Sequence, residues 1–320
     1  MFEKNKMALI LFALLLLMAV ISPAFRSWEN ISNVLWSTSI LGIMVAGTIY
    51  VPIAGGTDLS VGSMAGLAGI LVFLFTNNYE MAVLPAILLT VCITSCIGFI
   101  HGLIITRFEV PAFILTMAAK MYLLGIAMLI SDGNTIPFFK PKEFVAIGTT
   151  KIWGFPLPIY IMLTIVLISH LVLKYCAYGR KVLAVGGNPT TSDLCGINSR
   201  RVRTIGFAVS ALTAGLGGVI QASISQQAYY VAGKGMELEV LTAIVVGGNS
   251  ITGGGYGSVI GAFIGVILIG FVQNALNLGN IDAQYHLIVI GIIIIVALAM
   301  NNNSINFKWL FPKKTARAAE

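Results

Sequence analysis

Long apolar runs separated by short polar stretches recur along the whole chain. A hydrocarbon layer ~30 Å thick needs about 20 apolar residues for each helix that crosses it. Runs of roughly that length are expected at about 7–25, 31–54, 60–76, 81–106, 110–130, 154–174, 204–226, 237–250, 255–276 and 284–300. The pattern therefore predicts an all-α, polytopic integral membrane protein with about ten transmembrane helices.

Glycine pairs beside short polar side chains interrupt this pattern twice. One interruption is the stretch 54–63, and the other extends from Glu237 to Gly255. At membrane depth, the backbone groups freed by such a break must be satisfied by protein or by water. Segment 237–250 is short for a crossing helix, so a partly inserted, re-entrant helix is an alternative interpretation of it.

Composition supports the same class of protein. Of the 320 residues, 58% are hydrophobic and only 10% are charged, against about 25% charged in soluble domains. We expect one transmembrane domain over 1–300 and a basic cytoplasmic tail over 301–320. The first apolar run lacks a small-residue cleavage site, which favours a retained anchor over a signal peptide. The four cysteines show neither metal-type nor framework spacing.

The distribution of Lys and Arg predicts the orientation in the membrane. With the N-terminus in the cytoplasm, an even number of spans also places the C-terminus there. Thirteen of the 19 cations then fall on the cytoplasmic side and five outside, with Lys120 inside a span. This bias agrees with the positive-inside rule. It makes 176–203 a cytoplasmic loop and 131–152 an external loop, in which Pro137, Pro141 and Gly148 favour ordered turns.

The cytoplasmic loop 176–203 contains the signature of a short helix. Asn188 is a good N-cap, Pro189 suits the first helical position, and Gly196 can adopt the left-handed conformation just beyond the end. About two turns are too short to be stable alone in water. The helix is therefore expected to dock on something; an ordinary solvated loop is the alternative.

Catalytic chemistry has little support in the sequence. His101, His170 and His286 are isolated in apolar surroundings, which is typical of helix ends and packing positions. The chain has no G-x-x-x-x-G-K-[ST] phosphate loop despite 34 glycines. We expect no catalytic residue, no metal site and no cofactor in this chain. A membrane enzyme would need acids or histidines clustered at one membrane face, and none are visible.

Charged side chains in apolar surroundings need an explanation. Asp58 or Ser60 could simply cap the third membrane segment, or Asp58 could line a path or contact a neighbouring subunit. An ionised Asp at the bilayer centre costs roughly 2.5–3.5 kcal/mol on insertion scales, so Asp58 is expected near an interface or a cavity. Glu237 and Glu239 lie two apart and cannot share a helix face. Lys120 is either buried against the bundle or functional.

The stretch Gly56-Thr57-Asp58-Leu59-Ser60-Val61-Gly62-Ser63 resembles the G-I-D-L-S-V-G-S motif of permease subunits in bacterial ribose-type sugar ABC transporters. Further landmarks follow in family order, within about 30 to 300. They are Tyr178–Arg180, Ala184–Asn188, Gly196-Ile197, Ala243–Gly248, Gly253-Gly254, Gly270–Asn274 and Leu276–Leu278. The sequence departs from the family pattern at Thr57, where Ile is common, and at 189–192, where alanines are usual.

The resemblance implies an importer in the bacterial cytoplasmic (inner) membrane. It implies two permeases, a homodimer or a pair of paralogues, with two ATP-binding cassette subunits that hold ATP and Mg²⁺, and an external sugar-binding protein. No nucleic acid is expected as a partner. The coupling helix that docks on the ATPase would comprise Asn188, Pro189, Thr190, Thr191, Ser192, Asp193, Leu194, Cys195 and Gly196. The candidates for a translocation path or gate are Asp58, Ser60, Glu237, Glu239 and Asn249.

The resemblance leaves the substrate open. Ribose or another pentose is the first expectation, and hexoses remain alternatives. Broken helices with glycine pairs also suit an ion-coupled secondary transporter of a small polar solute. Against that class, acids expected for ion coupling at mid-membrane are scarce, and the capped cytoplasmic helix would have no role.

Overall fold

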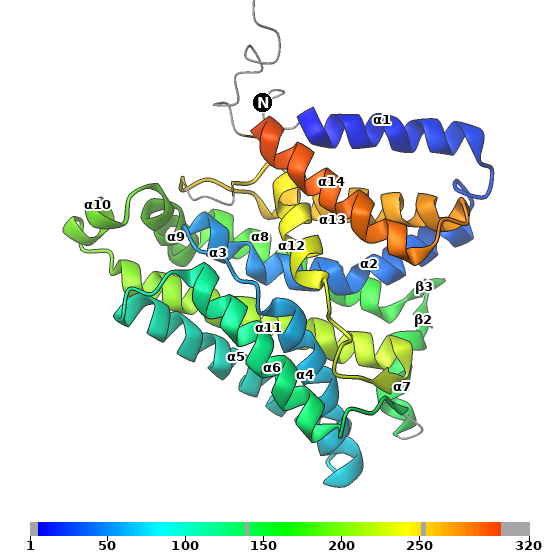
Figure 1. The fold of residues 1–320 in the computed structure, drawn as a ribbon, viewed down its shortest axis with the longest axis horizontal. Coiled ribbons are helices and arrows are strands. Elements are labelled where there is room, and N and C mark those ends of the chain that lie inside the picture. Colours follow the sequence, from blue (N-terminus) through cyan, green and yellow to red (C-terminus); the bar gives the residue numbers. More distant parts are fainter. Residues whose placement is uncertain (1–5, 138–140, 251–253, 302–320) are drawn as a thin grey trace, which may run out of the picture.

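The computed structural model describes residues 6–137, 141–250 and 254–301, and it is almost entirely helical (Figure 1). The helices before the loop 131–152 are α1 (Lys6–Ile21), α2 (Trp28–Thr48), α3 (Tyr50–Ile53), α4 (Val61–Phe73) with the π-helical turn η2 (Leu74–Asn78), α5 (Val83–Arg107) and α6 (Ala112–Ile130). Those that follow in the chain are α7 (Lys142–Thr149), α8 (Leu157–Tyr175), α9 (Ala177–Gly187), α10 (Pro189–Leu194), α11 (Ser199–Ser225), α12 (Met236–Val246), α13 (Val259–Leu278) and α14 (Ala283–Asn301).

Four very short strands complete the described part of the fold. They are β1 (Ile136–Pro137), β2 (Lys151–Ile152), β3 (Phe155–Pro156) and β4 (Gln227–Ala228). Strand β1 pairs antiparallel with β4, and β2 pairs antiparallel with β3. The indole Nε1 of Trp36 also donates to the Gly148 carbonyl at 3.0 Å. The prediction that 131–152 forms ordered turns is confirmed for the described part of that loop.

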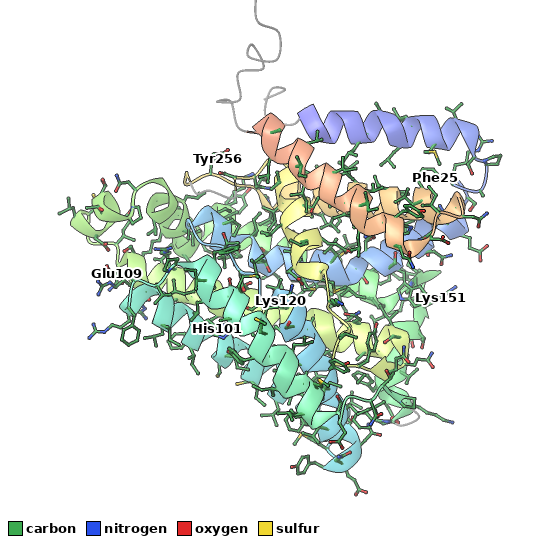
Figure 2. All side chains as sticks on the ribbon, in the orientation of Figure 1. Phe25, His101, Glu109, Lys120, Lys151 and Tyr256 are labelled. Carbon is green, nitrogen blue, oxygen red and sulfur yellow. The ribbon has the colours of Figure 1, made fainter. Side chains whose placement is uncertain are left out.

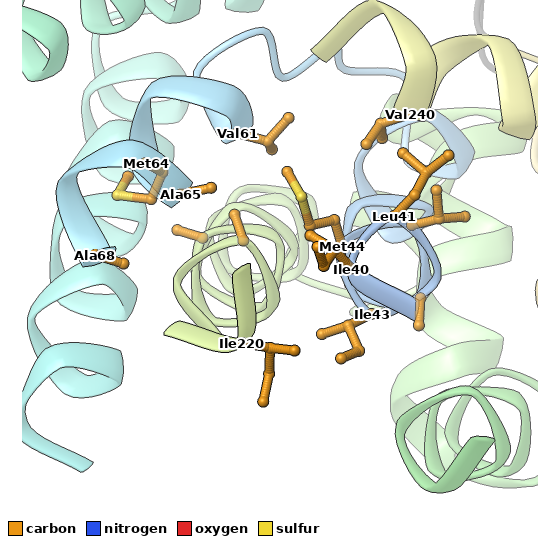
Figure 3. Packing of buried hydrophobic residues seen from close by; sticks show 14 of the residues in the cluster. Ile40, Leu41, Ile43, Met44, Val61, Met64, Ala65, Ala68, Ile220 and Val240 are labelled. Carbon is orange, nitrogen blue, oxygen red and sulfur yellow. The ribbon is translucent and has the colours of Figure 1, made fainter. Parts of the chain in front are cut away.

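Helix α11 lies at the centre of the bundle, packed between α2, α4 and α5 (Figure 3). Small residues allow this close approach. A Cβ added to Gly218 would lie 2.1 Å from the Ala65 carbonyl oxygen, and one added to Gly98 would lie 2.3 Å from the Cβ of Ala211. Close packing is how helices associate where no hydrophobic effect drives them together. The glycines of α11 therefore serve close helix packing.

Within the described residues, seven helical stretches are long and apolar enough to cross a membrane. They correspond to seven of the ten predicted segments. The segments at 7–25 and 284–300 form shorter apolar helices, α1 and α14. The eighth predicted segment is the helix α12, which has 11 residues and, at 1.5 Å per residue, is about 16 Å long. That length cannot cross ~30 Å of hydrocarbon, so the re-entrant alternative fits α12 better than a full crossing.

The start of α12 lies inside the molecule because the chain before it doubles back along α4. A Cβ on Gly66 would lie 2.6 Å from the Tyr230 carbonyl oxygen, and one on Gly62 would lie 2.3 Å from that of Gly233. The segment that follows α11 therefore runs beside α4 toward the first residues of that helix. As a result, the first turns of α4 and α12 are neighbours.

The two ends of the bundle carry different structures. Helices α9 and α10 project from one end, and α7 with the β2–β3 hairpin lies at the other (Figure 1). These are the ends predicted to face the cytoplasm and the exterior, respectively. The predicted basic tail, apart from Asn301 at the end of α14, lies outside the described residues.

Candidate functional site

Helix α10 forms with the predicted caps. The Asn188 side chain accepts a hydrogen bond from the Thr191 N–H at 2.9 Å, and Pro189 occupies the first helical position. Gly196 adopts φ +79°. The N–H of Ile197 then donates to the Ser192 carbonyl at 2.9 Å, which is the six-to-one bond of a Schellman motif. The sequence prediction of a helix capped at both ends is confirmed to within one residue.

The surface of α10 is open on almost every side. Ser192 is buried, whereas the side chain of Leu194 is 85% exposed. The other members of the predicted coupling set that are exposed are Asn188, Pro189, Thr190, Thr191, Asp193, Cys195 and Gly196. Leu194 thus presents an exposed apolar side chain on a six-residue helix, and a helix this short is stabilised chiefly by what it packs against.

Asp193 fixes α10 to the start of α11. One carboxylate oxygen accepts from the Ser199 N–H at 2.9 Å and the other from the Ser199 hydroxyl at 2.7 Å. These bonds, the backbone one first, hold the pKa of Asp193 below its ordinary value. Asn198 caps α11 through the Arg201 N–H at 2.8 Å. The predicted cytoplasmic loop is thus helical over most of its length, and the amphipathic helix α9 was not foreseen.

The sequence pattern did not predict helix α9. Gly186 and Gly187, a pair that usually favours a loop, are its last two residues. Buried Val182 and Val185 attach α9 to the main core. Two valines three residues apart beside Arg180 and Lys181 are an amphipathic signal that could have identified this helix.

Asp58 is buried, with 2% of its surface exposed. Its Oδ1 accepts from the Ser60 N–H at 3.0 Å and the Ser60 hydroxyl at 2.6 Å, and its Oδ2 accepts from the Ser210 hydroxyl of α11 at 2.8 Å. Neither Asp58 nor Ser60 caps α4 by a side-chain bond to the helix: Ser60 is the N-cap residue but makes no such bond. The first break is therefore held to α11 by a carboxylate.

A cavity of about 510 Å³ opens beside this break, toward the end that carries α10. Gly55, Thr57 and the turn from α5 to α6 line it, together with the start of α11. Arg200 pairs with Glu109 at 3.1 Å across its rim, and both side chains are exposed. Thr57, not Asp58, reaches the cavity wall. Asp58 itself is not among the residues that line this cavity.

Glu237 and Glu239 point to different partners, as their spacing predicts. Lys120 of α6 forms an ion pair with Glu237 Oε1, and Gln273 of α13 donates to Glu239 at 3.2 Å. The side chain of Glu237 is 3% exposed and that of Lys120 is 34% exposed. Figure 2 shows Lys120 midway between Glu109 at one end and Lys151 at the other. Sequence reasoning did not predict this pairing.

Asn249 braces the second break. Its amide donates to the Ile244 carbonyl at 3.0 Å, and its carbonyl oxygen accepts from the Ser258 N–H at 2.6 Å. The side chain is buried and links the end of α12 to the start of α13. The five path candidates therefore do not converge on one point: Asp58 and Ser60 lie together, while Glu237, Glu239 and Asn249 each hold a separate contact of α12.

Comparisons with known proteins agree with this architecture. A family model described as "Branched-chain amino acid transport system / permease component" matches residues 30–298. The chain belongs to this permease family. Its members are transporter subunits rather than catalytic enzymes.

Curated relatives of this permease span nearly all of it. The ribose import permease protein of Haemophilus influenzae is 37% identical over 296 residues, covering 91% of both chains. That of Escherichia coli K12 is 33% identical over 298 residues, covering 91% of this chain and 92% of the relative. The L-arabinose transport system permease protein of the same organism is 31% identical over 291 residues, covering 91% and 88%. No solved structure matches.

Proposed function

We propose that this chain is the membrane-spanning permease subunit of an ATP-driven importer of ribose or a related monosaccharide. The observation that carries the proposal is α10, a capped helix whose outer surface, including Leu194, is exposed. A separate ATPase subunit, which binds ATP and Mg²⁺, would cover this surface. The relatives named as ribose and arabinose permeases support the sugar class, whereas the broader family description also covers amino acid transport.

The proposed mechanism is alternating access. An external sugar-binding protein delivers the sugar to the end that carries α7 and the β2–β3 hairpin. ATP binding closes the ATPase dimer, and α10 passes that movement to the helices of this chain and of a second permease, either another copy or a paralogue. The protein acts in the bacterial cytoplasmic membrane. Selectivity would reside largely in the binding protein, so the permease needs only weak contacts to the sugar, for which Asp58, Ser60, Glu237, Glu239 and Asn249 remain candidates.

The test is co-purification with a ribose-type ATPase subunit expressed beside the permease. Leu194→Glu is the informative variant, because the side chain is exposed and its replacement leaves the fold intact. We expect recovery of the ATPase to fall at least tenfold while the yield of permease is unchanged. Trp153→Glu is the matched control: Trp153 is 93% exposed at the opposite end, so the same kind of change there should leave the ATPase bound.

An ATPase that binds the Leu194→Glu variant as well as wild type would show that α10 is not the docking helix. Transport is tested separately, by uptake of labelled D-ribose and L-arabinose into cells. Uptake that requires the ATPase subunit and persists with proton and sodium uncouplers supports the importer. Uptake that is independent of the ATPase and abolished by uncouplers would favour the secondary transporter, whose support here is the buried Asp58 and Glu237 beside broken helices.

A further inference from the structure

The end of α9 lies directly against both breaks in the helical pattern. A Cβ added to Gly186 would lie 1.7 Å from the carbonyl oxygen of Ile53 and 2.9 Å from the Cα of Gly255. Ile53 is the last residue of α3, before the first break, and Gly255 belongs to the second break. The N–H of Gly254 also donates to the Gly186 carbonyl at 3.0 Å. Three distant parts of the chain therefore meet at this one glycine.

The contact is equally close when viewed from the second break. A Cβ on Gly255 would lie 2.3 Å from the Leu183 carbonyl oxygen and 2.5 Å from the Gly187 nitrogen. Ordinary van der Waals contact begins near 3.4 Å, so only glycine allows these backbones to approach so closely. We name the close backbone contact of Gly186 with Ile53 and Gly255 the glycine junction.

Backbone contact has a mechanical consequence. Where side chains separate two helices, a change of rotamer can absorb a small displacement. Close-packed backbone atoms have no such freedom, and densely packed interiors transmit strain. A shift of α9 by a few tenths of an ångström must therefore move the ends of both breaks.

Helix α9 is in turn fixed to the exposed helix α10. Gly187 ends α9 and Asn188 already caps α10, so no flexible linker separates them. The Tyr178 hydroxyl donates to the Val202 carbonyl of α11 at 3.2 Å, and its ring lies 5.8 Å from that of Tyr50. The two short helices are thus held as one unit against the bundle.

We propose that the glycine junction passes the movement of α10 to both breaks at once, with Gly186 as the positioning residue. The inference rests on the proposed function, since it requires an ATPase to move α10. On one side of the junction the displacement reaches Asp58 and the start of α4. On the other side it reaches Asn249 and the end of α12. In this proposal Gly186 couples ATP hydrolysis to transport without contacting the sugar or the ATPase.

The first experiment compares Gly186→Ala with Gly187→Ala in the complete importer, reconstituted in proteoliposomes with ATPase subunit and binding protein. The two residues are adjacent at the end of α9. A Cβ added to Gly186 would overlap the Ile53 carbonyl oxygen, whereas one added to Gly187 meets no described atom within 4 Å. We expect the Gly186→Ala complex to assemble and hydrolyse ATP while D-ribose uptake falls at least tenfold. The number of ATP molecules hydrolysed per ribose imported then rises, whereas a purely structural defect would lower both rates together. Gly187→Ala should stay within twofold of wild type.

A second pair keeps the proposal testable if Gly186→Ala fails to fold. Gly255→Ala adds a Cβ against α9, whereas a Cβ on Gly254 meets, among the described residues, only the Tyr256 ring, at 3.4 Å. Both residues have positive φ, +64° at Gly255 and +111° at Gly254. The control variant Gly254→Ala therefore carries at least as much backbone strain as Gly255→Ala. Uncoupling in Gly255→Ala but not in Gly254→Ala supports the junction.

Two results would overturn the inference. One is a Gly186→Ala importer whose ribose uptake and ATP consumption equal those of wild type. The other is equal loss of uptake in Gly254→Ala and Gly255→Ala, which would show that backbone strain and not contact with α9 matters. Failure of the wild-type permease to bind any ATPase would instead contradict the proposed function, so the two failures are distinguishable.

Discussion

The two breaks solve the same physical problem with different chemistry. In the first, the Asp58 carboxylate accepts three hydrogen bonds, one of them from Ser210 on the central helix α11. In the second, the neutral amide of Asn249 bonds to two residues that are close to it in sequence, Ile244 and Ser258. The first brace is charged and tertiary, and the second is neutral and local.

The difference indicates which break is the more rigid. Hydrogen bonds to an ionised group are roughly twice as strong as those between neutral groups. The first break should therefore open only when the bundle itself is disturbed. The second can rearrange with α12 alone, which suits a short helix that starts inside the protein.

Asp58→Ala is expected to have the largest effect. It leaves the Ser60 N–H and the Ser60 and Ser210 hydroxyls without their buried acceptor, so stability should fall by roughly 2–4 kcal/mol. Thermal unfolding of the detergent-solubilised permease measures this. Asp58→Asn keeps one acceptor oxygen and should cost less than half as much. Equal melting temperatures for Asp58→Ala and Asn249→Ala would contradict the proposed contrast between the breaks.

Lys120→Met should have the next largest effect on stability, because it leaves the buried Glu237 carboxylate without its ion-pair partner. Glu237 Oε2 already lacks a hydrogen-bond partner among the described residues. Lys120 is partly exposed, which weakens the pair, so we expect a loss of about 1–3 kcal/mol. The double variant with Glu237→Gln should recover much of that loss, since no charge is then stranded. Additive losses in this double-mutant cycle would show that the two side chains are not coupled.

Asn249→Ala should have a smaller and more local effect of about 1–2 kcal/mol. The Ser258 N–H loses its acceptor and the end of α12 loses its link to α13. Hydrogen exchange should quicken in α12 and the first turn of α13, while protection of α11 is unchanged. Uniform loss of protection across the bundle would show that this brace is not local.

Asn188→Ala should have the smallest effect on global stability. It removes one helix cap, worth about 1 kcal/mol, from a helix that the rest of the bundle does not need. Melting should therefore change little, while ATPase recovery in the co-purification assay falls severalfold. Asn188→Asp preserves the acceptor and is the matched control. A large drop in melting temperature would indicate that α10 is part of the folding core.

Local chemistry explains which features the sequence could predict. Asn188, Pro189 and Gly196 define α10 because a cap, a first-turn proline and a left-handed glycine act within ten residues of one another. The ion pair between Lys120 and Glu237 joins positions 117 apart in the chain, and no periodicity brings them together. Likewise, the sequence could not predict the hydrogen bond between Asp58 and Ser210, because that contact depends on how α11 packs. For a related reason the sequence did not decide whether α12 crosses the membrane. An apolar run does not show how deep in the bilayer its helix begins.

The placement of the first turns of α4 and α12 side by side has an electrostatic consequence. Each helix N-terminus carries the equivalent of roughly half a positive elementary charge, and here two of them face one another inside an apolar body. A Cβ on Gly62, in the first turn of α4, would lie 2.3 Å from Glu237 Oε2 in the first turn of α12. The paired dipoles thus offset part of the cost of burying this carboxylate.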